Sequence, residues 1–253
     1  MYSKIEALLK KINEYPPLTE GEMLRLREEF IISFTYHSNA IEGNTLTLQE
    51  TALVLQERIT IAQKPLKEHL EAIGHKEAFN YIVELVPQET PLCERTIKEV
   101  HSLVLMDRPQ DKGTYKRIPV TIQGAVKMLP EPHQVPLLME QLLEEYRQYD
   151  EMHLIEKVAL FHLKFEEIHP FVDGNGRTGR LLLNFELMKE GYPPINIKFQ
   201  DRRKYYDCFT DYLLKDTPEA MTELIAGYVE EELERYLSIV QTANQLSEMD
   251  IER

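Results

Sequence analysis

Apolar residues recur every three or four positions along most of this 253-residue chain, which is the spacing of amphipathic helices. Near the N-terminus, the pattern predicts a short helix ended by Pro16-Pro17. Two helices capped by Thr19 and Thr47 follow, the first reaching about Ala40. The same spacing predicts later helices at about 66–86, 94–106, 134–149, 151–168, 177–190, 201–214 and 218–242. The expected fold class is therefore all-α.

One segment, residues 113–132, departs from the helical spacing. Its apolar residues alternate with other residues before a glycine, at Tyr115, Ile118, Val120, Ile122 and Gly124. This alternation predicts a small β-hairpin on the helical body, and Pro119 confines it to an edge. An edge has unpaired backbone groups. The segment is therefore either a plain surface loop with weak strand character or a docking edge for an extended peptide.

Charge and cysteine content limit the class of protein. Acidic residues outnumber basic ones by 43 to 29, and the net charge of −14 disfavours nucleic acid as a partner. No apolar run reaches the length that spans a bilayer, and the N-terminus lacks the apolar core of a secretory signal. Cys93 and Cys208 provide neither a disulfide framework nor a paired metal motif. We expect a soluble, cytoplasmic protein with no nucleic-acid or membrane partner.

The most informative residues are 169–180, which read His-Pro-Phe-Val-Asp-Gly-Asn-Gly-Arg-Thr-Gly-Arg. Gly174 and Gly176 permit a tight turn whose N–H groups can point into one concavity, and a predicted helix follows. The N-terminus of a helix favours anions. Arg177 and Arg180 lie three residues apart on one face of that helix, where their guanidinium groups can grip phosphate oxygens. The stretch therefore predicts a cradle for a di- or triphosphate.

Two further residues of this stretch supply chemistry. Asp173 provides one carboxylate beside the phosphates, an arrangement typical of a Mg²⁺ site, with Mn²⁺ as the alternative metal. The imidazole of His169 can take a proton from a hydroxyl group. Each feature alone is common in ordinary turns and exposed helices. Eight specified positions together, however, arise by chance with a frequency on the order of 10⁻¹⁰ per starting position.

The stretch resembles the Fic family pattern His-x-Phe-x-Asp/Glu-Gly-Asn-Gly-Arg-x-x-Arg at every specified position. This resemblance implies a mostly helical Fic fold and the transfer of AMP from ATP to a Ser, Thr or Tyr hydroxyl of a protein. It also implies that His169 is the general base and that Asp173 holds the metal. The residues that it implies for ATP binding are Asp173, Gly174, Asn175, Gly176, Arg177 and Arg180.

The same resemblance gives roles to two other segments. The predicted hairpin at 113–132 is similar to the family's flap, which aligns a target peptide by strand addition. The central flap residues are Thr121, Ile122, Gln123 and Gly124. Tyr205 and Tyr206 resemble the family's aromatic pair beside the adenine, and ordinary helix packing is the alternative interpretation of both tyrosines.

A shorter motif lies upstream at residues 38–44, Ser-Asn-Ala-Ile-Glu-Gly-Asn. It resembles the inhibitory motif of Fic proteins that carry their own N-terminal inhibitory helix. Glu42, at a helix end that Gly43 would terminate, can then pair with Arg180 and keep that arginine from the γ-phosphate. Ser38 lies four residues before Glu42 and shares its face of the helix.

Three alternatives stay open at this stage. In some relatives the same glutamate positions a water that removes AMP, so the chain could be a de-AMPylase or a bifunctional enzyme. A phosphate transferase is the second alternative, but such relatives change the Gly-Asn-Gly-Arg segment, which this chain retains. The third is a non-catalytic ATP sensor. His169 argues against a sensor, because a sensor needs no general base.

The expected organisation has three parts. Residues 1–64 form an N-terminal helical extension with the inhibitory helix, residues 65–215 the Fic core, and residues 216–253 the C-terminal helices. The expected partners are ATP as substrate, a protein substrate docked on the 113–132 hairpin, the chain itself as a target of modification, and a second copy in a homo-oligomer. No feature of the sequence names the target protein or the type of acceptor residue.

Overall fold

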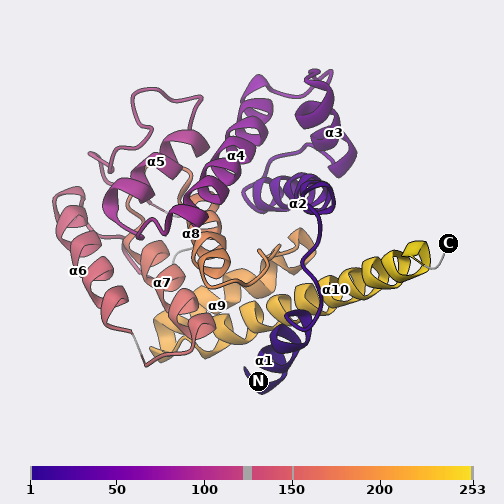
Figure 1. The fold of residues 1–253 in the computed structure, drawn as a ribbon. Coiled ribbons are helices and arrows are strands. Elements are labelled where there is room, and N and C mark those ends of the chain that lie inside the picture. Colours follow the sequence, from indigo (N-terminus) through magenta and orange to yellow (C-terminus); the bar gives the residue numbers. More distant parts are fainter. Residues whose placement is uncertain (1, 122–126, 150, 252–253) are drawn as a thin grey trace.

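The computed structural model describes residues 2–121, 127–149 and 151–251, with side chains described up to residue 245. These residues form ten α-helices and no strand, which confirms the predicted all-α class (Figure 1). The helices are α1 (Tyr2–Ile12), α2 (Glu20–Ile41), α3 (Leu48–Ala52), α4 (Leu66–Leu85), α5 (Glu94–Val104), α6 (Val135–Gln148), α7 (Leu154–Ile168), α8 (Asn175–Lys189), α9 (Arg202–Lys215) and α10 (Glu219–Ile251). None of the described helices combines the length and the hydropathy needed to cross a bilayer.

Capping boxes start two helices at the residues that the sequence predicts. The hydroxyl of Thr19 accepts the N–H of Glu22, and the carboxylate of Glu22 accepts the N–H of Thr19. Thr47 and Glu50 repeat this exchange at the start of α3. Because the first N–H groups of a helix have no partner within it, each such cap stabilises its helix by about 1 kcal/mol.

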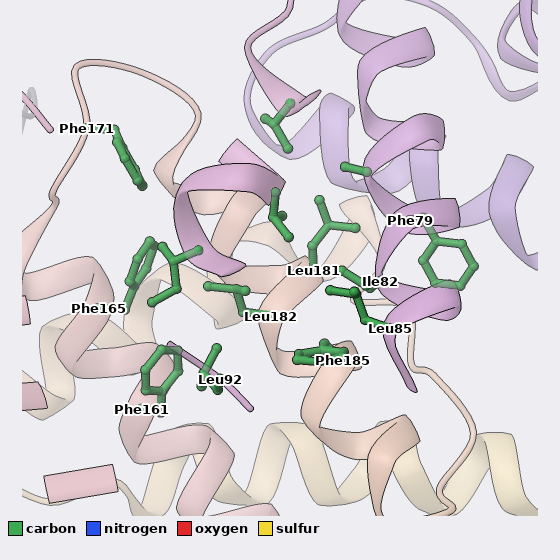
Figure 2. Close-up of a cluster of buried hydrophobic side chains, with 14 of the residues drawn as sticks. Phe79, Ile82, Leu85, Leu92, Phe161, Phe165, Phe171, Leu181, Leu182 and Phe185 are labelled. Carbon is green, nitrogen blue, oxygen red and sulfur yellow. The ribbon is translucent and has the colours of Figure 1, made fainter. Parts of the chain in front are cut away.

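Helix α8 lies at the centre of the fold and is buried on both sides. Leu181, Leu182 and Phe185 belong to a cluster with apolar side chains of α2, α4, α5, α6 and α7 (Figure 2). Leu183 and Leu187 belong to a second cluster, shared with α1, α7, α9 and α10. The packing therefore fixes the N-terminal end of α8, and the loop before it, in the middle of the molecule.

The first and the last helix lie side by side (Figure 1). Ile5 and Leu8 of α1 are buried in the second cluster together with Met221 and Val229 of α10. The prediction that the last helix ends near residue 242 is wrong, because α10 continues to Ile251. No glycine or proline stops it in this stretch, and extending an existing helix costs little per residue.

The predicted β-hairpin has no strand in its described parts, 113–121 and 127–132. Pro119 and Pro130 each remove a backbone donor, which works against a ladder between the two arms. The first arm is instead tied to the loop after α7, because the N–H of Lys116 donates to the carbonyl of Pro170 over 2.8 Å.

Of the four predicted flap residues, only Thr121 lies within the described residues, and it is exposed. Ile122, Gln123 and Gly124 lie outside the described residues. The three-part division at 1–64, 65–215 and 216–253 stays a prediction.

Candidate active site

The loop between α7 and α8, residues 169–174, is held in place by its own side chains. His169 ends α7 with φ of 48°, in the left-handed region, while its N–H still donates to the carbonyl of Phe165 at 2.9 Å. The side chain of Asn175 accepts the N–H of Phe171 and donates to its carbonyl, both at 2.9 Å. Because the side chain of Asn175 is used within the loop, only its backbone is left to contact a ligand.

A buried histidine of α5, His101, contacts the 169–174 loop. The ring of His101, on α5, stacks on Phe171 with the centroids 3.6 Å apart. Its Nε2–H donates to the carbonyl of Asp173, and its Nδ1 accepts the N–H of Gly113, both at 2.9 Å. Burial lowers the pKa of His101 to about 4, so the ring is neutral. The sequence gives no signal for this role, because His101 lies about 70 residues away from the loop.

The anion cradle that the sequence predicts lies at the N-terminal end of α8. Gly174, the N-cap, has φ of +78°, which favours glycine. A Cβ atom at Gly176 would overlap the carboxylate oxygen Oε1 of Glu42. Glu42 thus places a negative charge against the first turn of α8, where the free N–H groups and the helix dipole attract anions.

Glu42 and Ser38, from the end of α2, hold Arg180. The guanidinium donates to Oε1 of Glu42 at 2.8 Å, to the hydroxyl of Ser38 at 3.0 Å and to the carbonyl of Ser38 at 2.8 Å. Arg180 is almost fully buried, at 2 % exposure. Gly43 follows with φ of +95°, where α2 has ended. The inhibitory motif and the last arginine of the 169–180 stretch are therefore in direct contact.

Asp173 lies beside the cradle among three cations. Its Oδ1 accepts the N–H of Gly174 at 2.7 Å and lies 3.3 Å from Arg177. Its Oδ2 lies 3.1 Å from Arg108 and 3.9 Å from Lys67. Burial opposes ionisation of Asp173, but the cations outweigh it and lower the pKa of the carboxyl, which is therefore ionised near neutral pH. Arg108 and Lys67 reach the site only through the tertiary fold, and the sequence pattern did not single them out.

The residues present fit a magnesium ion that is shared with a phosphate ligand. No cluster of three or more His, Cys, Asp or Glu side chains suited to a metal occurs in the described part of the chain. Asp173 offers an ionised, 30 % exposed carboxylate next to the cradle. Because Mg²⁺ keeps several waters and pairs one or two carboxylates with phosphate oxygens, this donor set suits it.

Arg177 is buried beneath the cradle and only partly paired. It is 2 % exposed, and its Nη1 lies 3.5 Å from Glu71 of α4. Its Nε and Nη1 have no hydrogen-bond partner among the described residues. Buried donors without partners are rare in folded proteins, so these two atoms are unused hydrogen-bond donors beneath the cradle.

A cavity of about 580 Å³ opens beside Glu42, Gly176 and Arg180, and neither Asp173 nor Arg177 is part of its lining. Its lining includes Glu42, His169, Gly176, Arg180, Tyr205, Tyr206, Phe209 and Leu213. Tyr205 is buried, and its hydroxyl donates to Nε2 of His162 at 2.7 Å while accepting from Arg180 at 3.3 Å. Tyr206 is 43 % exposed and donates to the carbonyl of Ile41 at 3.1 Å. Tyr206 therefore offers its ring to a ligand, whereas Tyr205 is used in a hydrogen-bond network.

The 169–180 stretch, the cradle and the cavity agree with the outcome of the family comparison. The sequence profile of the Fic/DOC family matches residues 91–187. A structural relative, the Fic domain containing signalling protein from Bacteroides thetaiotaomicron, superposes with a TM-score of 0.81 and is 31 % identical, over 94 % of this chain and 95 % of that chain. The chain belongs to the Fic/DOC family.

Other relatives extend the likeness. Fic-1 (residues 134–508) from Caenorhabditis elegans is 28 % identical with a TM-score of 0.80, over 92 % of this chain and 69 % of that chain. The protein adenylyltransferase Fic of Drosophila yakuba is 36 % identical over 224 residues, 87 % of this chain and 44 % of the relative. That of Nematostella vectensis is 39 % identical over 189 residues, 73 % and 44 %. The chain thus spans about half the length of the curated relatives it matches.

Proposed function

We propose that this chain transfers AMP from ATP to a hydroxyl group of a target protein. The observation that carries the proposal is the position of the Glu42 carboxylate, which occupies an anion site formed by Gly176 and Arg180 next to His169. A site that holds one carboxylate in this way also suits a phosphate group. The name of the Drosophila and Nematostella relatives, protein adenylyltransferase, supports the same reaction.

In the proposed complex, the triphosphate of ATP replaces Glu42 at the start of α8. The backbone of Gly174, Asn175 and Gly176 and the side chains of Arg177 and Arg180 bind the phosphates. Mg²⁺ held by Asp173 supplies positive charge to the phosphates. The ring of Tyr206 lies along the base. The target docks on the 113–121 segment, where Arg117, Ile118 and Pro119 are exposed.

The chemical step then needs one base. His169 takes the proton of the target hydroxyl as the hydroxyl oxygen forms a bond to the α-phosphorus, and pyrophosphate leaves with the electrons of the broken phosphoanhydride bond. The buried arginines stabilise the negative charge that collects on the leaving group. The modified target carries a phosphodiester-linked AMP.

The contacts of Arg180 also support the proposal that the chain is autoinhibited. While Glu42 and Ser38 hold Arg180, that arginine is not available to the γ-phosphate. A triphosphate that binds without Arg180 is bent away from the in-line arrangement, and a misplacement of about 1 Å can cost about 100-fold in rate. We therefore propose that movement of the end of α2 switches the enzyme on.

The test is the Glu42→Gly variant with labelled ATP and a cell lysate. It incorporates about tenfold or more AMP into protein, including into itself, than the parent chain does, because Arg180 is free. Glu29→Gly is the matched control. It places a glycine at an exposed position of α2 and leaves the contact between Glu42 and Arg180 intact. Equal incorporation of labelled AMP by Glu42→Gly and by the parent chain contradicts the inhibitory role of Glu42.

A second variant separates an enzyme from an ATP sensor. His169→Ala, introduced together with Glu42→Gly, loses AMP transfer while retaining ATP, because the imidazole is needed for the proton and not for the phosphates. Mass spectrometry of the product distinguishes AMP from phosphate. Retention of full transfer without the imidazole, or addition of phosphate instead of AMP, overturns the proposed reaction.

Removal of AMP is a second candidate function for the same site. The carboxylate of Glu42 is 36 % exposed and lines the same cavity as His169, so it can hold a water beside a modified hydroxyl. In that direction Glu42 acts as base and His169 as acid. Incubation of a pre-modified target with the parent chain then releases AMP, and Glu42→Gly releases none.

A further inference from the structure

A second carboxylate, Glu166, lies directly behind the imidazole of His169. Glu166 precedes His169 by one turn of α7, and its Oε2 lies 3.6 Å from Nδ1 of the ring. The two side chains are only 14 % and 15 % exposed. Nδ1 of His169 and Oε1 of Glu166 are buried, and neither has a hydrogen-bond partner among the described residues. The imidazole of His169 and the carboxylate of Glu166 are therefore each the nearest candidate hydrogen-bond partner of the other.

The packing of α7 against α8 confines the carboxylate of Glu166. A Cβ atom at Gly179 of α8 would lie 3.0 Å from Oε1 of Glu166 and 2.7 Å from the ring of His162. Only a residue without a side chain allows this approach. The neighbouring Glu167 pairs with Lys127, whereas within the described residues Glu166 has an ion-pair contact with His169 alone.

We propose that Glu166 is a positioning residue for the general base His169, an inference that rests on the proposed function. Nδ1–H of His169 donates to the carboxylate of Glu166, and this leaves Nε2 without a proton and directed to the cavity that the ring lines. During transfer, the hydroxyl oxygen bonds to the α-phosphorus, the bond from that phosphorus to the pyrophosphate oxygen breaks, and the hydroxyl proton moves to Nε2. Glu166 then stabilises the imidazolium.

Other charged and titratable groups surround this pair. Those that face it from other parts of the described chain are Arg180, Glu42, Tyr205, Tyr206, Lys116, Lys127 and His162. Arg180 and Glu42 largely compensate each other at 2.8 Å. Among the described residues Glu166 has an ion-pair contact with His169 alone, at 3.6 Å from Nδ1, so its charge acts directly on the ring.

The test compares three variants in the Glu42→Gly background. Glu166→Gln lowers kcat at least about tenfold with the KM for ATP changed less than about twofold, and moves the acidic limb of the pH–rate profile to lower pH. Glu166→Asp keeps the carboxylate and keeps that limb in place. Glu156→Gln is the control, since it neutralises a half-buried carboxylate about 15 Å away on the same helix.

A measurement without turnover separates this inference from the proposed function. The ¹⁵N resonances of the His169 ring report which nitrogen carries the proton. With Glu166 present, the neutral ring carries it on Nδ1, and Glu166→Leu shifts the population to Nε2–H because the acceptor is lost. An unchanged tautomer in Glu166→Leu, or a kcat of Glu166→Gln equal to that of the Glu156→Gln control, overturns the role of Glu166.

Discussion

At the scale of single residues, Gly176 shows why this site tolerates so little change. It must leave room for a phosphate in the proposed complex, and in this structure it leaves room for the Glu42 carboxylate. A Cβ atom would also lie 3.0 Å from Nη1 of Arg180. The absence of a side chain at this position therefore allows the contact between Glu42 and Arg180 as well as the proposed phosphate cradle.

Gly176→Ala destabilises the parent chain by about 1–3 kcal/mol, because the added methyl group displaces the Glu42–Arg180 pair from a close-packed site. In the Glu42→Gly background the loss is smaller, since the overlapping carboxylate is gone. Urea unfolding of the four proteins in this double-mutant cycle measures the coupling between the two positions. Identical losses in both backgrounds show that the methyl group does not act through Glu42.

The residues of the 169–180 stretch could be read from the sequence because their spacing is local. Two glycines in a turn, a following helix and two arginines three residues apart predict a cradle without knowledge of distant contacts. His101, Arg108 and Lys67 could not be read in this way. Each is an ordinary residue on a helix or in a loop, and only the packing of α4 and α5 beside the loop gives it a contact there.

At the scale of elements, α2 connects local helix chemistry with the site. The Thr19 capping box fixes its start. Its last turn carries Ser38, and Glu42 is its C-cap. The helices were predictable because apolar periodicity and caps are local signals. The 113–132 segment was not, because Lys116 gives its backbone N–H to Pro170 instead of to an opposite strand.

Thr19→Ala lowers the free energy of unfolding by about 1 kcal/mol, because the N–H of Glu22 loses its acceptor at the start of α2. Thr19→Ser retains the hydroxyl and loses no more than a few tenths of that value. Chemical unfolding monitored by circular dichroism measures both variants. A loss of the same size in Thr19→Ser assigns the effect to the methyl group instead of the cap.

At the scale of the whole molecule, buried neutral histidines tie stability to pH. His75, His101 and His162 are fully buried, and burial lowers the pKa of each, to about 4 for His101 and about 3 for His162. In the unfolded chain these rings titrate near pH 6.5. Below that pH the unfolded state binds more protons than the folded state does, so folding stability falls as the pH falls.

For His101 this loss amounts to about 3 kcal/mol between pH 6.5 and pH 4, and it levels off below the folded pKa. Urea unfolding at a series of pH values measures the slope, which His101→Gln reduces and the exposed His133→Gln leaves unchanged. If His101→Gln does not fold, the titration of the His101 ring in the parent chain by NMR gives the same test. A ring that titrates near pH 6.5 contradicts the prediction.

The sequence by itself determined the all-α class, most helix starts and the composition of the 169–180 stretch, because these follow from periodicity, caps and short spacings along the chain. The tertiary structure alone decided which side chains meet. Glu42 reaches Arg180 from 138 residues away, and Asp173 meets Arg108 and Lys67 from two other parts of the chain. The physical reason is that α8 is buried on both sides, so the helices packed around it fix the neighbours of its N-terminal end.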